Sequence, residues 1–284
     1  MQHIKVLGHN IAYQEEGHGE QTLVFVHGNS MSSSIFDKQL SSSLKNKFRM
    51  LAFDLPGHGK SDNAIDPEAT YTLPGYTAII QCALEKLEVK APIVIGFSLG
   101  GNIALELSAT GIDLMGLIII GCNPLPHDTA HILDGYAKDI DMDFLNKDCV
   151  SDTEVEDYAK LVLQGAVGAA PKFIFNDVKR TDGRSRPILM TSIFSSHFLD
   201  QAAWVSTCST PLAMILGEND RTINHQHLRS LTYGNLWRGD IQVIPGACHA
   251  PFRDVADEFN ALLEAFVETA CARPKKSLQF LPPN

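Results

Sequence analysis

The most constraining feature of the sequence is a series of short apolar runs, each bounded by turn residues. Runs that are apolar at nearly every position are typical of strands buried on both faces, as in a parallel sheet covered by helices. Six such runs are present: Leu23–Val26, Met50–Phe53, Ile93–Ile95, Leu117–Ile120, Leu212–Leu216 and Ile241–Ile244. Apolar residues recur at helical spacing in Gly75–Leu87, Gly101–Ala109 and Val255–Val267. This alternation predicts a doubly wound α/β sheet.

Two segments extend or interrupt that alternation. Ile4–Leu7 and Ile11–Gln14 flank a Gly-His-Asn turn and predict an N-terminal hairpin, which makes an eight-stranded, mostly parallel sheet. Residues 123–187 contain no strong strand and only short helical pieces, at Ala130–Ile140 and Asp152–Leu163. We therefore expect a helical lid at 123–187, inserted into a core formed by residues 1–122 and 188–284.

Composition narrows the classes of partner. The net charge is −10, and no basic stripe exists apart from Pro274-Lys-Lys276, which argues against nucleic acid or an anionic membrane as the partner. No apolar run is long enough to cross a bilayer. The N-terminal segment lacks the basic start and apolar stretch of a signal peptide, and the six cysteines are scattered without a CxxC pair. These features predict a cytoplasmic protein with reduced thiols and no metal site.

The motif Gly96-Phe97-Ser98-Leu99-Gly100 matches G-x-S-x-G and lies between a predicted strand and a predicted helix. A serine in that context sits on a tight turn, and its neighbours must be small enough for the backbone to close up. The helix N-terminus offers free N–H groups to a developing oxyanion. We therefore predict that Ser98 is a nucleophile; the alternative is a serine in a glycine-rich turn that matches by chance.

A serine hydroxyl needs a base to remove its proton, and in this kind of fold the acid and the histidine follow the serine along the chain. Asp220 follows the Leu212–Leu216 run, and His249 follows the Ile241–Ile244 run. His249 is the predicted base. Asp220 is the preferred acid, with Glu218 as the competitor, and Asp220 could instead cap a helix that begins near Thr222.

The loop after Leu23–Val26 reads HGNSMSSSIF and contains four serines within five positions. None has glycines around it as Ser98 does, so we expect Ser30, Ser32, Ser33 and Ser34 to cap and begin a helix. Acyl transfer needs two backbone donors at the oxyanion, one after the nucleophile and one from this loop. The predicted donors are the amides of Leu99 and Asn29, and His27 is expected to have a structural role.

Together these motifs resemble the α/β-hydrolase superfamily. A narrower set resembles the metal-independent N-acyl-homoserine lactonases of that fold: HGNS…IF (27–36), DLPGHGKS (54–61), RTDGR (180–184), GNLW (234–237) and HAPFR (249–253). The resemblance implies a Ser98–His249–Asp220 triad, an oxyanion hole at Asn29 and Leu99, and substrate contacts from Gly28, Phe97 and the lid residue Tyr158. It implies no cofactor, and a monomer or homodimer that acts on a small-molecule ester or lactone.

The predicted reaction is opening of the lactone ring through an acyl-enzyme. Alternatives with the same residues are a general carboxylesterase for short acyl esters, a cofactor-free dioxygenase, and a small-molecule receptor with little or no turnover. Haloalkane dehalogenase and epoxide hydrolase are disfavoured, because both need Asp where this chain has Ser98. Cys248, which precedes the histidine, and Phe97, which precedes the serine, depart from the residues common in such enzymes.

Overall fold

The computed structural model describes residues 1–140, 142–163 and 171–272. Eight strands form one sheet in the order β1-β2-β4-β3-β5-β6-β7-β8. β2 pairs antiparallel with both β1 and β4, and all the other neighbours are parallel. The strands are β1 Gln2–Val6, β2 His9–Glu16, β3 Thr22–Val26, β4 Arg49–Phe53, β5 Ile93–Phe97, β6 Gly116–Ile120, β7 Leu212–Gly217 and β8 Gln242–Ile244.

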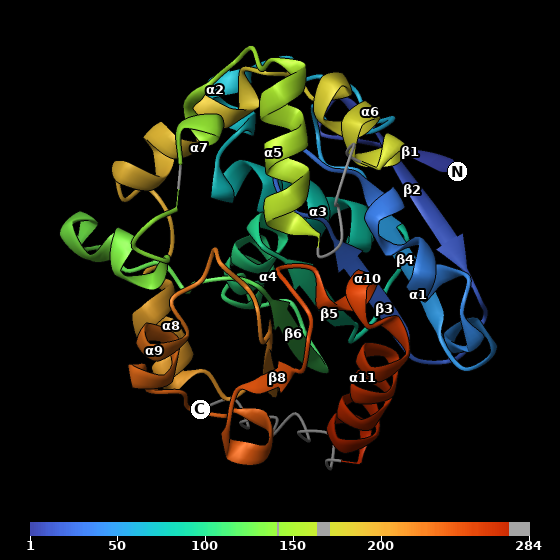
Figure 1. Ribbon diagram of the computed structural model, residues 1–284. Helices are drawn as coiled ribbons and strands as arrows, with labels where there is room; N and C mark the ends of the chain where they lie inside the picture. The colour runs from blue at the N-terminus through green and yellow to red at the C-terminus, as the bar shows by residue number, and fades with distance from the viewer. Residues whose placement is uncertain (141, 164–170, 273–284) are drawn as a thin grey trace, which may run out of the picture.

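Helices connect the strands and cover both faces of the sheet (Figure 1). The α-helices are α1 Asp37–Leu40, α2 Pro67–Thr70, α3 Leu73–Lys86, α4 Leu99–Ser108, α5 Asp152–Val162, α6 Lys172–Arg180, α7 Ser185–Phe194, α8 Gln201–Thr207, α9 His225–Ser230, α10 Pro251–Asp254 and α11 Ala256–Cys271. The 3-10 helices are η1 Ser33–Phe36, η2 Ser43–Asn46, η3 Thr129–Gly135, η4 Asp143–Asn146 and η5 Trp237–Gly239.

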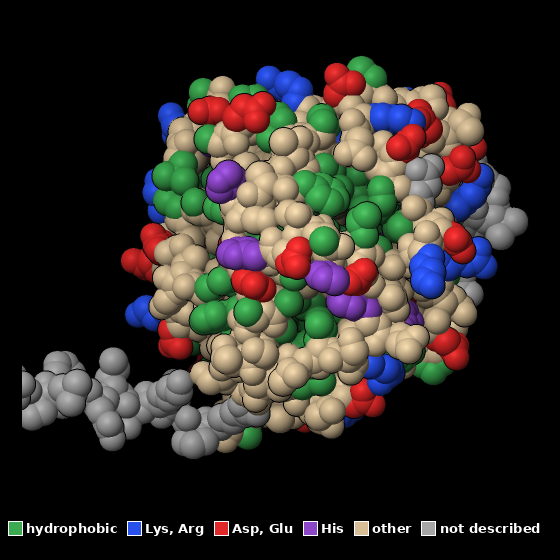
Figure 2. All heavy atoms as spheres, turned by 90° about the vertical axis from the view of Figure 1, so that its left-hand side faces the viewer, with side chains coloured by type: hydrophobic (Ala, Val, Ile, Leu, Met, Phe, Trp, Pro, Cys, Tyr) green, Lys and Arg blue, Asp and Glu red, His purple; other side chains and the backbone are tan. Residues whose placement is uncertain are grey.

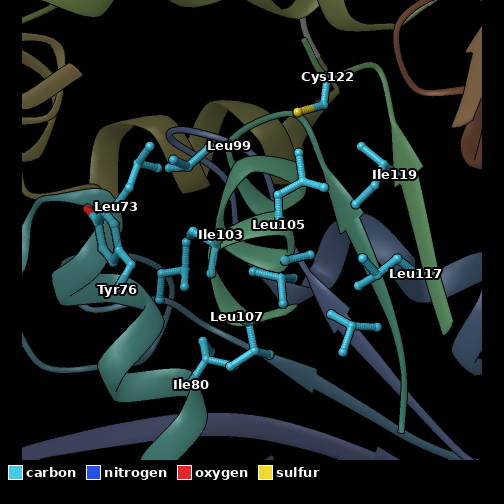
Figure 3. Packing of buried hydrophobic residues seen from close by; sticks show 14 of the residues in the cluster. Leu73, Tyr76, Ile80, Leu99, Ile103, Leu105, Leu107, Leu117, Ile119 and Cys122 are labelled. Carbon is cyan, nitrogen blue, oxygen red and sulfur yellow. The ribbon is translucent and has the colours of Figure 1, made fainter. Parts of the chain in front are cut away.

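The sheet separates two apolar cores. Successive side chains of a strand point to opposite faces, so a strand that is apolar throughout supplies both cores. In β3, Val24 and Val26 pack with α3 and α4, whereas Leu23 and Phe25 pack with α1 and α11. Figure 3 shows the first of these cores, where side chains of α3 and α4 interdigitate beside Leu117 and Ile119 of β6.

The sequence-based fold prediction is confirmed. Each of the eight expected strands is present within one or two residues of its predicted bounds, and the parallel arrangement follows from the double-sided burial of β3 to β7. The segment between β6 and β7 contains η3, η4 and α5 to α8. α5, α6 and α7 lie together at the top of Figure 1. The lid at 123–187 stays a prediction, and α7 crosses its expected boundary at residue 187.

One face of the molecule carries α8 and α9 and is seen in Figure 2. Apolar side chains reach its surface in patches among histidine and acidic side chains, while Lys and Arg side chains lie mainly at its margins. None of the helices in the described ranges is long and apolar enough to cross a membrane.

Candidate active site

Ser98 lies on a sharp turn between β5 and α4. Its backbone has φ of 51° and ψ of −117°, in the left-handed region that a non-glycine residue rarely adopts. The Ser98 amide donates to the carbonyl of Ile120 at 2.8 Å, which ties the turn to the end of β6. Such strain persists only where the surroundings enforce it, and it projects the side chain out of the sheet edge. Ser98 is half-buried, so part of the residue stays accessible.

The glycines of the motif are required by close packing of backbone on backbone. A Cβ on Gly96 would lie 2.2 Å from the carbonyl oxygen of Gly100, and a Cβ on Gly100 would lie 2.0 Å from that of Val26. Neither contact is sterically possible. The turn therefore closes only with these residue types, as the sequence motif predicted.

The strand order brings the other predicted residues to the same edge of the sheet. β5 lies beside β6, and β6, β7 and β8 follow in order, so the loops after β5, β7 and β8 leave at one end. His249 Nδ1 lies 2.8 Å from Asp220 Oδ2, and both side chains are buried. Glu218 is exposed and its Oε2 accepts instead from the Gly246 amide at 2.9 Å. The geometry thus favours Asp220 over Glu218 as the histidine's partner.

Thr222 joins this pair and was missed by the sequence analysis. Its hydroxyl donates to Asp220 Oδ1 at 2.6 Å and lies 2.6 Å from His249 Nδ1, and its amide also donates to Asp220 Oδ1. The available signal was the short D-x-T spacing, in which an aspartate accepts from the backbone two residues on. Asp220 therefore closes a local turn as well as facing the histidine, but α9 begins later, with Asn224 as its N-cap.

The surroundings hold Asp220 ionised. Burial alone would raise the pKa of its carboxyl, but the charge of His249 and hydrogen bonds from His249 and Thr222 lower it below the ordinary value. A carboxylate accepts the Nδ1 proton of the imidazole, which leaves the lone pair of His249 Nε2 available to take a proton. In the described part of the chain, no hydrogen bond yet joins His249 to the Ser98 hydroxyl; such bonds often tighten only when substrate binds.

The loop after β3 supplies the second predicted oxyanion donor. The Leu99 amide is at the first residue of α4, where N–H groups have no partner within the helix. The Asn29 amide follows β3, which pairs with β5. Neither amide has an acceptor among the described residues. His27 accepts from the Leu55 amide at 3.0 Å, which fits the structural role expected for it.

The serine-rich run is a cap and an anchor. Ser32 is the N-cap of η1, as predicted for this run, and accepts from the Ser34 amide. Both hydroxyls also donate to Asp177 of α6, at 2.7 Å and 2.9 Å. Ser30 departs from the prediction, because it caps no helix and adopts φ of 56°.

A cavity of about 750 Å³ opens over these residues. Ser98, His249 and Asn29 line it, together with apolar side chains from the segment between β6 and β7. The apolar lining residues from that segment include Ile140, Met142, Phe144, Leu145, Leu161, Val162, Leu189, Met190 and Ile193. A volume of this size with a few polar groups at one end is typical of a small-molecule site.

The three residues predicted to contact substrate lie around the same cavity or beside Ser98. Tyr158 lines the cavity, stacks on Phe144 with ring centroids 4.3 Å apart, and donates its hydroxyl to the Asn29 carbonyl at 2.5 Å. The ring of Phe97 is fully buried and lies 5.0 Å from that of His249. A Cβ on Gly28 would lie 3.3 Å from that of Ser98. Their contacts with substrate stay predictions.

Possible metal ligands do not gather at this site. Within residues 1–140, 142–163 and 171–272, no group of three or more His, Cys, Asp or Glu side chains is placed to hold a metal ion.

Comparison with protein families matches residues 23–262 to the model of an alpha/beta hydrolase family. Among solved structures, N-acyl homoserine lactonase AidH in complex with N-hexanoyl homoserine lactone superposes with a TM-score of 0.89. It is 32% identical in sequence, and the match covers 95% of this chain and 97% of the lactonase.

Curated relatives give a second comparison. A pimeloyl-[acyl-carrier protein] methyl ester esterase of Xylella fastidiosa is 26% identical over 259 residues, which cover 87% of this chain and 95% of the esterase. An uncharacterized hydrolase, YugF, of Bacillus subtilis is 31% identical over 117 residues, and the match spans 42% of that protein.

Proposed function

The chain belongs to the alpha/beta hydrolase family, and we propose that within this family it opens the lactone ring of N-acyl-homoserine lactones. It is a carboxylic ester hydrolase, in keeping with the esterases and lactonases it is similar to. The main support for the lactonase proposal is the similarity to the AidH lactonase, which covers 95% of this chain and 97% of that one. A match of this extent takes in most of the segment between β6 and β7, which lines the cavity. A quorum-quenching role would follow from that activity.

The proposed chemistry begins with proton transfer. His249 Nε2 takes the proton of Ser98 as Oγ bonds to the lactone carbonyl carbon, while Asp220 stabilises the imidazolium that forms. The amides of Asn29 and Leu99 hold the oxyanion. The ring C–O bond then breaks, and the homoserine hydroxyl leaves with the proton held by His249.

Hydrolysis of the acyl-enzyme completes the cycle. His249 activates a water, which attacks the ester carbonyl on Ser98 and releases the serine and a carboxylate. The product is an N-acyl-homoserine, one water heavier than the lactone. Each step uses side chains and amides of this chain, so the proposed mechanism requires no metal or organic cofactor.

The cavity suits an acyl tail. Its apolar walls come mainly from η4, α5 and α7, and burial of each methylene of a tail contributes about 0.8 kcal/mol to binding. We propose that residues 123–187 act as the lid over this cavity, and that Tyr158 contacts the lactone from α5.

A carboxylesterase for linear acyl esters is the second candidate. It is favoured by the match to the pimeloyl-[acyl-carrier protein] methyl ester esterase along almost all of that relative. The residues and the chemistry would be the same, and only the leaving group would differ: a free alcohol instead of a tethered hydroxyl.

Relative kcat/KM separates the two candidates. Purified protein is assayed with N-hexanoyl and N-decanoyl homoserine lactones, p-nitrophenyl butyrate and methyl pimelate. The lactonase proposal predicts that a homoserine lactone is the best substrate by at least about tenfold, which corresponds to about 1.4 kcal/mol in the barrier. Linear esters cleaved with lactones untouched would instead establish the carboxylesterase.

A further inference from the structure

Arg186, at the start of α7, is the largest of the fully buried side chains, with only 1% of its surface exposed. Its guanidinium donates to the carbonyls of Lys147 and Asp148, at 2.6 Å and 2.9 Å, and to the Ser30 hydroxyl at 3.1 Å. Within the described ranges, no carboxylate forms an ion pair with it. A buried cation that forms no ion pair is costly to desolvate, and an apolar side chain often fills such a space at lower cost. The charges of Asp148 and Asp182 offset only part of that cost, since burial still lowers the pKa of Arg186. Packing alone therefore does not account for an arginine here.

A first series of contacts links Arg186 to Asn29, the proposed oxyanion donor, through Ser30. The Ser30 hydroxyl, which accepts from Arg186, donates to Asn29 Oδ1 at 2.6 Å. Ser30 also has φ of 56°, and this strained conformation sets the direction of the peptides around it. Arg186 thus holds a strained residue directly after Asn29.

A second series of contacts links Arg186 to Asn29 through Phe144 and Tyr158. The guanidinium lies over the ring of Phe144, 5.3 Å from its centroid, and that ring stacks on Tyr158 at an angle of 5°. The Tyr158 hydroxyl then donates to the Asn29 carbonyl. Arg186 therefore acts on both the side chain and the carbonyl of Asn29, through Ser30 and through the Phe144–Tyr158 stack.

We infer that Arg186 is a positioning residue for the oxyanion hole, which couples α5 and α7 to the Asn29 amide. The inference rests on the oxyanion role given to Asn29 in the proposed function. An amide displaced from the oxyanion loses much of its effect on the transition state, because hydrogen-bond strength falls steeply with distance and angle. A substrate in its ground state has little charge on that oxygen and is affected less.

Two readouts distinguish positioning from support of the fold. The first is kcat and KM for p-nitrophenyl butyrate. The second is the affinity for butylboronic acid, whose tetrahedral adduct with Ser98 mimics the oxyanion, compared with the affinity for the product butyrate. We expect Arg186→Met to lower kcat by roughly tenfold to a hundredfold with KM within about threefold. Affinity for the boronic acid should fall by the same factor, with butyrate binding unchanged.

Companion variants keep the test decisive if Arg186→Met does not fold. Ser30→Ala removes the hydroxyl that joins Arg186 to Asn29 but keeps the arginine. It should also lower kcat while leaving KM within about threefold. Arg186→Lys, which cannot reach all three acceptors at once, should lie between Arg186→Met and wild type. Equal loss of boronic acid and butyrate affinity, or a Ser30→Ala enzyme with wild-type kcat, would overturn the inference.

Arg180 provides a matched control. It ends α6 and donates to the Ser61 carbonyl at 2.6 Å and to Asn63 Oδ1 at 3.0 Å, away from Asn29. Arg180→Met should lower the unfolding temperature and leave kcat and boronic acid affinity within about twofold of wild type. Failure of the lactonase proposal would be read from the wild-type enzyme on lactones, whereas failure of this inference is read from the variants on an ester and a boronic acid.

Discussion

The imidazole of His249 faces the carboxylate of Asp220 at 2.8 Å, across the loops that follow β7 and β8. Thr222 bonds to both groups, and all three residues are less than a tenth exposed. This arrangement fixes the plane of the imidazole and places its proton on Nδ1. It also distinguishes Asp220, which contacts the histidine, from Glu218, which does not; the sequence alone only favoured Asp220 over Glu218.

Replacing the acid should therefore act through the histidine. Asp220→Asn presents an amide to Nδ1 and favours the wrong tautomer, so kcat is expected to fall by roughly ten-thousandfold. Glu218→Gln is the matched control, because Glu218 is exposed and accepts from the Gly246 amide; its kcat should stay within a few-fold of wild type. Steady-state kinetics on one ester would check both, and the reverse ranking of the two variants would contradict the assignment.

The tight turn around Ser98 predicts a large cost for a single methyl group. Gly100→Ala would place its Cβ 2.0 Å from the Val26 carbonyl oxygen, and backbone cannot yield cheaply. The free energy of unfolding should fall by at least about 3 kcal/mol, measured by urea denaturation. Gly111→Asn is the control: its φ is 86° and a Cβ there meets nothing within 4 Å, so its loss should stay below about 1 kcal/mol. Similar losses in both variants would refute the packing argument.

The loss of stability in acid should depend on a histidine outside the Asp220–His249 pair. Burial, with a smaller contribution from the neighbouring His27, lowers the pKa of His58 from 6.5 to about 3. The unfolded chain binds this proton below pH 6.5 while the folded chain does not, so folding loses stability as the pH falls from 6.5 towards 3. The slope from one such group is about 1.4 kcal/mol per pH unit.

His58→Gln should flatten that pH dependence. Urea denaturation between pH 4 and pH 7 would measure it, with His18→Gln, at an exposed histidine, as the control. A variant whose stability falls as steeply as that of wild type would show that acid sensitivity arises elsewhere.

The cavity wall on α7 should set the preferred acyl length. Ile193 is buried and lines the cavity, whereas the next residue, Phe194, is 43% exposed. Ile193→Trp should lower kcat/KM for a ten-carbon acyl chain by at least about tenfold relative to a four-carbon chain, since several methylenes lose their place. Phe194→Trp should leave that ratio unchanged. If Ile193→Trp affected both chain lengths equally, the acyl tail would lie elsewhere.

The sequence was sufficient to predict what depends on local pattern. Strands such as β3 and β6 are apolar at nearly every position, which indicates burial on both faces, and the glycines around Ser98 identify a turn that few other residues can form. The order of the loops along the chain then predicted that Asp220 and His249 lie at the same sheet edge, as they do.

Contacts between distant loops could not be predicted in the same way. Arg186 carries no motif of its own, and the D-x-T spacing indicates only the local bond from Thr222 to Asp220, not its contact with His249. These roles depend on distances set by the packing of α5, α7 and the strand ends. The departure at Ser30 has the same cause. Its hydroxyl accepts a hydrogen bond from Arg186, which lies 156 positions further along the chain, and does not cap η1, whose N-cap is Ser32.

The most direct test of the central claim is the product mass from N-hexanoyl homoserine lactone, with wild-type protein and Ser98→Ala compared in the presence of a metal chelator. The account predicts that wild type converts the lactone to a product heavier by one water, that the chelator has no effect, and that Ser98→Ala forms none above the rate of the buffer. An unchanged lactone with the wild-type protein, beside cleavage of p-nitrophenyl butyrate that is lost in Ser98→Ala, would contradict the lactonase and leave a serine carboxylesterase.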